Sequence, residues 1–258
     1  MNTKTLTPRA LSVIDQYLHF KVGGAVCSVP YFNNKTVRAR AALPVFVGKG
    51  SPKEIFDEMS AFLVKSHVSP DSVADDALKK LLVDNSIGID CSAFAYYVLD
   101  AESREAGKKP LDRRLSPIRA SGLLGRIAFK LNPAKNIDVA TFANDKNSVV
   151  IRPEDSQPGD VITMMKDDGH DSRNHILVIH QVEYQNFAAT KIHYSHAIAY
   201  PEDGLYGSGI RQGTIEIADP GKPLLDQAWT EDGKTGADSR IAARARESTT
   251  ELRRLSAS

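Results

Sequence analysis

The first half of the chain carries apolar residues at helical spacing. From Thr7 to before Gly23 and from Ser51 to Leu63 apolar side chains recur every three or four positions, so each segment predicts a helix with one buried face. Residues 51–54 match a capping box with proline at the first helical position. Further helices are predicted from Pro70 onwards and directly after Asp90, a favourable N-cap residue.

From residue 148 onwards the pattern changes to short β-rich runs separated by turn residues. The predicted strands comprise residues 148–151, 161–165, 175–182, 191–200 and 213–217. Proline and glycine at positions 220–223 are expected to end the sheet. Because helices gather before the strands rather than alternating with them, the chain is predicted to have an α+β fold.

The composition is that of an ordinary globular chain. Its 258 residues suit one large domain with appendages, and its net charge of +1 gives no general attraction for nucleic acid. Lysine, arginine and proline concentrate in residues 107–136. We interpret this stretch as a basic, solvated connection, since aromatic residues for base stacking are not interleaved with the charges.

The sequence shows neither a membrane span nor a leader. No apolar run is long enough for a membrane helix, and the first residues lack the apolar stretch of a signal peptide. A cytoplasmic location is therefore expected, with export by another route left open. Cys27 and Cys91 are expected to be free thiols, because a chain of this size does not resemble a disulfide-stapled mini-domain.

Cys91 is the candidate nucleophile. It directly follows Asp90, in the first turn of a predicted helix, where the unpaired N–H groups and the positive end of the helix dipole favour a thiolate. Packing is the alternative role, since free cysteine is among the most buried residue types. The run from Asp90 to Phe94 resembles the Asp-Cys-Ser-Gly-Phe nucleophile motif of the NlpC-type cell-wall cysteine peptidases, a papain-like family, with Ala93 in the glycine position.

Two downstream segments extend this resemblance. Residues 158–162 are similar to the Pro-Gly-Asp turn and strand that precede the catalytic histidine of the family, and His175 then heads an apolar strand. On the next strand His196, followed by alanine, resembles the third catalytic residue. His193 is the fallback, and it projects to the opposite face from His196 because strand side chains alternate.

The resemblance implies a papain-like fold, with the helix of Cys91 packed on an antiparallel sheet that carries the histidines and the site in the cleft between them. It implies a peptidase or amidase acting on peptidoglycan stem peptides or similar peptides. Cys91 would attack the carbonyl, His175 would transfer the proton and His196 would orient His175, while Asp90 and Ser92 would contact the amine end of the substrate. No cofactor and no metal are expected, and the oligomeric state is left open.

The predicted organisation has a region of helices and extended segments at 1–84, a catalytic core at 85–220 with the basic insertion 107–136, and a C-terminal extension at 221–258. One alternative is a catalytically inactive papain-like domain that binds a peptide or protein. A second alternative is a metal site formed by His170, His175 and His180 with Asp167 or Asp171. It is disfavoured because His175 and His180 lie five positions apart on one strand and so project to opposite faces.

Overall fold

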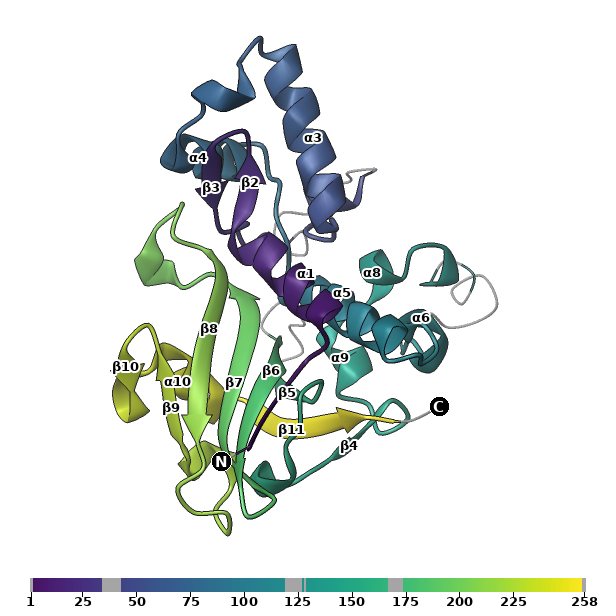
Figure 1. The fold of residues 1–258 in the computed structure, drawn as a ribbon, viewed down its shortest axis with the longest axis vertical. Helices are drawn as coiled ribbons and strands as arrows, with labels where there is room; N and C mark the ends of the chain where they lie inside the picture. Colours follow the sequence, from purple (N-terminus) through teal and green to yellow (C-terminus); the bar gives the residue numbers. More distant parts are fainter. Residues whose placement is uncertain (1, 34–42, 119–126, 128, 167–173, 257–258) are drawn as a thin grey trace.

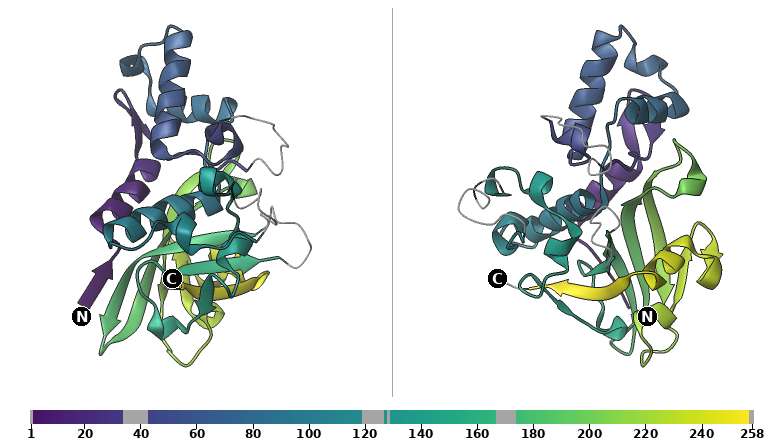
Figure 2. Two further views of the ribbon diagram at one scale, coloured as in Figure 1. Left: turned by 90° about the vertical axis from the view of Figure 1, so that its right-hand side faces the viewer. Right: turned by 180° about the vertical axis from the view of Figure 1, so that it is seen from behind.

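The computed structural model describes residues 2–33, 43–118, 127, 129–166 and 174–256. A long, twisted antiparallel sheet forms one side of the molecule, and the helices of the first half lie against it and extend beyond it (Figure 1). The views in Figure 2 show two helices, α1 (Pro8–Leu18) and α5 (Cys91–Glu105), side by side. The helices α3 (Pro52–Lys65) and α4 (Asp75–Asp84) and the hairpin of β2 (Phe20–Val22) and β3 (Ala25–Cys27) project past the end of the sheet. The chain is therefore α+β, as the hydrophobic pattern predicted.

Within the described residues the sheet has nine strands, eight of them in the order β10-β9-β8-β7-β6-β5-β11-β4, and all their pairings are antiparallel. The strands are β1 (Asn2–Thr5), β4 (Ser148–Val150), β5 (Val161–Met165), β6 (His175–Gln185), β7 (Ala188–Ile198), β8 (Gly209–Glu216), β9 (Ala228–Glu231), β10 (Lys234–Thr235) and β11 (Thr249–Leu255). Off this path, β1 pairs with the second half of β6.

Local capping explains where the main helices begin. The helices are α1 (Pro8–Leu18), α3 (Pro52–Lys65), α4 (Asp75–Asp84), α5 (Cys91–Glu105), α6 (Leu111–Arg114), α8 (Pro133–Asn136), α9 (Val139–Phe142) and α10 (Arg240–Arg246). The predicted capping box of α3 is present, since Ser51 Oγ accepts from the Glu54 N–H and Glu54 Oε2 accepts from the Ser51 N–H. Pro70 starts only a 3₁₀ turn, and α4 follows it. None of the helices within the described part combines the length and apolarity needed to span a bilayer.

Two apolar clusters lie on the two faces of the sheet. The cluster between the sheet and α5 includes Phe94, Val98, Val161, Ile176, Val178 and Ala197. The cluster between the sheet and α10 includes Leu177, Ile179, Tyr194, Trp229, Ile241 and Ala245. Alternation along each strand therefore decides which helix a side chain meets.

The predicted boundary at residue 220 does not separate two structural units. Residues 221–258 supply β9, β10, α10 and β11, and β11 lies in the sheet between β5 and β4. Proline and glycine at 220–223 form a connection, after which the sheet continues. Strand pairing is a long-range interaction, so turn residues mark where a strand ends and not whether the sheet has ended. At the other end of the chain, β1 also joins this sheet and α1 packs against α5.

Candidate active site

Cys91 is the first residue of α5, and its thiol lies against the start of β6. The Asp90 backbone is extended, and its Oδ1 accepts from the Ala93 N–H at 2.8 Å, which caps the helix as predicted. The Cys91 thiol donates to the Asn174 carbonyl at 4.0 Å, and the Ile176 N–H is also directed at the sulfur. Because Asn174 and Ile176 flank His175, the sulfur lies next to the backbone of His175.

Lys49 occupies the polar side of the same helix end. Its buried ammonium lies 2.7 Å from Asp90 Oδ2 and donates to Ser92 Oγ at 2.6 Å and to the Ile137 carbonyl at 3.0 Å. Asp90 and Ser92 therefore contact a lysine of the same chain. Their substrate-binding role remains a prediction, and both line a small cavity beside Cys91. Sequence reasoning missed Lys49, because no local pattern marks its distant partners.

The structure brings His175 and His196 together. Nε2 of His175 lies 2.7 Å from Nδ1 of His196, and both rings are almost completely buried. His193, the fallback, lies on the other face of β7 and bonds Glu183 at 2.7 Å. Of the two candidates, His196 is therefore the one that contacts His175, and its catalytic role stays a prediction.

The imidazoles do not lie in a cleft between the helices and the sheet. Alternation along β6 puts His175 on the side of Leu177 and Ile179, which is the face covered by α10. α5 covers the other face. Cys91 at the tip of α5 reaches the first residues of β6, where its sulfur contacts the backbone on either side of His175.

Glu231 is a further residue of this group. Its Oε2 lies 2.6 Å from Nε2 of His196, its Oε1 accepts from the Tyr200 hydroxyl at 2.7 Å, and its side chain also accepts from Tyr194 at 3.3 Å. Sequence reasoning missed Glu231 because it lies beyond the predicted end of the sheet. The available signal was the Asp232-Gly233 pair, whose positive φ angles make a tight hairpin turn between β9 and β10.

The electrostatic state of the thiol differs from the expectation. Burial raises the pKa of Cys91 to about 11, Asp90 adds to this, and Lys49 and Arg244 act in the opposite direction. Burial, followed by Arg244 and His196, lowers the pKa of His175 well below its ordinary value. At neutral pH the pair therefore consists of a thiol and an uncharged imidazole rather than a preformed ion pair.

Nothing in the described ranges groups three or more His, Cys, Asp or Glu side chains in a way that suits a metal ion. His180 is hydrogen-bonded to Ser195 at 2.9 Å. His170, Asp167 and Asp171, the other members of the metal alternative, lie outside the described residues.

Comparison with family models, with curated proteins and with solved structures finds no match for this chain. The structure itself shows an α+β fold with a large antiparallel sheet. The function rests on the chemistry of the site.

Proposed function

We propose that this chain is a cysteine peptidase or amidase of the papain-like, NlpC type. Cys91 is the nucleophile, His175 the general base and acid, and His196 the residue that orients His175. One arrangement carries the proposal: the thiol lies against the backbone of His175, whose Nε2 is engaged by His196. Because His196 engages Nε2, the nitrogen of His175 that is left to take the thiol proton in this proposal is Nδ1.

The neutral state of the pair defines the first step. His175 Nδ1 accepts the thiol proton as the Cys91 sulfur attacks the carbonyl carbon, and the imidazolium then gives this proton to the leaving nitrogen. An amine departs and a thioester remains on Cys91. Water, deprotonated by His175, then attacks the thioester. This step releases a carboxylic acid and regenerates the Cys91 thiol.

The resemblance of residues 90–94 to the NlpC-type motif supports peptides, and peptidoglycan stem peptides first, as substrates. The competing reading is a papain-like binding module, in which the same residues form a pocket without turnover. Burial of the thiol, with only 4 % of Cys91 exposed, is compatible with both readings. A covalent probe separates them.

The test uses p-nitrophenyl acetate with a Cys27→Ser background, so that Cys91 is the remaining thiol. We expect release of nitrophenolate, an acetyl group on Cys91 by mass spectrometry, and loss of this group as acetate with time. Cys91→Ser and His175→Asn should lose the acetylation. His193→Gln is the matched control and should retain it, since His193 contacts Glu183 on the other face of β7.

Acetylation of Cys91 that is equally fast in His175→Asn would contradict the Cys-His pair. Absence of acetylation in the otherwise native protein, together with unchanged peptide binding by Cys91→Ser, would establish the binding module instead. Release of an amine from peptidoglycan stem peptides then tests the substrate class.

A further inference from the structure

A buried carboxylate ends the chain of contacts that begins at His175. Glu231 comes from β9 and has 4 % of its surface exposed, while His196 in the centre of the chain is completely buried. Burying a carboxylate is unfavourable unless hydrogen bonds or positive charge compensate for it. Three donors meet Glu231: the His196 ring and the hydroxyls of Tyr194 and Tyr200.

The ionisation of Glu231 limits the protons that each ring can carry. Burial opposes ionisation, but His196, Tyr200 and Arg211 together keep the pKa of Glu231 below its ordinary value. An ionised carboxylate only accepts hydrogen bonds, so Nε2 of His196 carries a proton. In neutral His196 the other nitrogen, Nδ1, is then an acceptor.

The same reasoning continues to His175. Since Nδ1 of neutral His196 accepts, the 2.7 Å contact requires that Nε2 of His175 donates. Nδ1 of a neutral His175 then lacks a proton and is a base. With the opposite tautomer of His196, Nδ1 of His175 would carry the proton, and the ring could not take one from the thiol.

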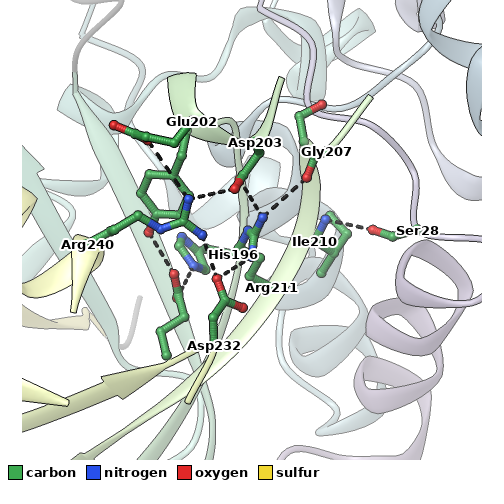
Figure 3. Close-up of polar contacts among 12 residues, drawn as sticks. Ser28, His196, Glu202, Asp203, Gly207, Ile210, Arg211, Asp232 and Arg240 are labelled. Atoms are coloured by element: carbon green, nitrogen blue, oxygen red, sulfur yellow. Dashed lines mark hydrogen bonds and ion pairs between the residues drawn. The ribbon is translucent and has the colours of Figure 1, made fainter. Parts of the chain in front are cut away.

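Two arginines, each bound to the same two aspartates, lie against the ring of Tyr200. Asp203 bridges the guanidinium groups of Arg240 and Arg211, at 2.6 and 2.5 Å, and Asp232 joins the same two arginines on the side of the hairpin turn (Figure 3). The two guanidinium carbons lie 4.0 Å (Arg240) and 5.4 Å (Arg211) from the centre of the Tyr200 ring. Two guanidinium groups therefore lie against the ring of Tyr200 while its hydroxyl donates to Glu231.

We propose that Glu231 is a positioning residue that selects the base-competent tautomers of His196 and His175. It also stabilises the positive charge that His175 gains when it takes the thiol proton. Glu231 acts through His196 and does not touch the substrate. The role in proton transfer rests on the proposed function, whereas the choice of tautomer does not.

The test compares Glu231→Gln with Glu183→Gln. Both substitutions keep the shape of a side chain that bonds a histidine at 2.6 to 2.7 Å, but Glu183 bonds His193 on the other face. By analogy with the loss of an orienting carboxylate in other nucleophile-histidine sites, Glu231→Gln should slow acetylation of Cys91 by about 10³-fold or more. Glu183→Gln should leave the rate within about twofold of the native value, since it changes nothing near Cys91.

The tautomers are read directly from imidazole nitrogen chemical shifts by NMR, with His175→Asn and His196→Asn for assignment. In the native protein we expect a protonated Nε2 and an unprotonated Nδ1 on both rings at neutral pH, and in Glu231→Gln a mixed or reversed pattern. Native tautomers and a native acetylation rate in Glu231→Gln would overturn the proposal. If the native protein is never acetylated but its tautomers change in Glu231→Gln, the proposed function fails while the positioning role of Glu231 stands.

Discussion

Lys49 places a buried positive charge beside the candidate nucleophile. Its ammonium contacts Asp90 and Ser92, the two residues on either side of Cys91. Without this charge, only Arg244 and the Ile176 N–H would oppose the effect of the Asp90 carboxylate on the developing thiolate. Lys49 therefore has two effects, because it holds the helix cap and it lowers the cost of ionising Cys91.

Replacing Lys49 by methionine tests both effects. Lys49→Met should raise the pKa of Cys91 further above its value of about 11, because an attractive charge is removed while Asp90 stays. It should also lower the free energy of unfolding by about 3 kcal/mol, since one partner of a buried ion pair is left alone. The midpoint of iodoacetamide alkylation against pH, measured by mass spectrometry in the Cys27→Ser background, reports the pKa, and urea unfolding reports the stability.

The matched control is Lys53→Met, which removes an exposed lysine paired with Asp57 in the first turn of α3. It should change the alkylation midpoint very little. A midpoint for Lys49→Met at or below that of Lys53→Met would show that Lys49 does not influence the thiol.

At the scale of elements, β11 joins parts of the chain that are far apart in sequence. It pairs with β5 on one side and with β4 on the other. Arg254 on this strand donates to Asp160 through two nitrogens, at 2.9 and 2.8 Å, and Asp160 is buried just before β5. Burial raises the pKa of Asp160, and Arg254 opposes this rise.

Removal of this arginine should destabilise the whole protein. Arg254→Met leaves the Asp160 carboxylate buried without its cation, so we expect a loss of about 3 kcal/mol in the free energy of unfolding at neutral pH. Arg152→Met is the control, because Arg152 pairs with Asp155 at the surface, where solvent screens the pair, and its loss should change stability much less. Equal urea midpoints for the two variants would show that β11 is not held by the Arg254–Asp160 pair.

Elements defined by local interactions were predictable, whereas contacts between distant segments were not. The caps at Ser51 and Asp90 follow from side chains within three residues of each other. His196 was chosen over His193 from strand alternation and a motif. Glu231 contacts His196 across the sheet, and its strand, β9, was missed because the proline and glycine at 220–223 were interpreted as the end of the sheet. The spacing of apolar residues along the chain does not indicate which strands pair with each other.

At the scale of the whole molecule, the site depends on the complete sheet. The thiol comes from α5, the imidazoles from β6 and β7, and the carboxylate from β9. β8 lies between β7 and β9, so His196 and Glu231 are neighbours only when all three strands are paired. Partial unfolding of the C-terminal strands would therefore remove the orienting carboxylate before it disturbed Cys91.

The half-buried His180 and the buried His175 couple the stability of this sheet to pH. Burial, followed by His193, lowers the pKa of His180 from 6.5 to about 4. As the pH falls below 6.5, the unfolded chain takes up a proton that the folded chain refuses, so stability is fully present above 6.5 and is lost as the pH falls towards 4. His180 alone should lower the free energy of unfolding by about 2 kcal/mol between pH 6.5 and pH 5. His175 acts in the same direction, since its pKa is also lowered by burial.

His180→Gln isolates this contribution, because glutamine can still accept the hydrogen bond from Ser195 while it carries no titrating group. Urea unfolding at several pH values should give a shallower loss of stability for His180→Gln than for the native protein between pH 6.5 and pH 5. Because the pKa of Glu231 is lowered in the folded chain, Glu231 makes stability depend on pH only below its ordinary pKa of 4.5, outside the range from pH 6.5 to pH 5. Parallel curves for His180→Gln and the native protein would mean that His180 takes up its proton equally in the folded and the unfolded chain.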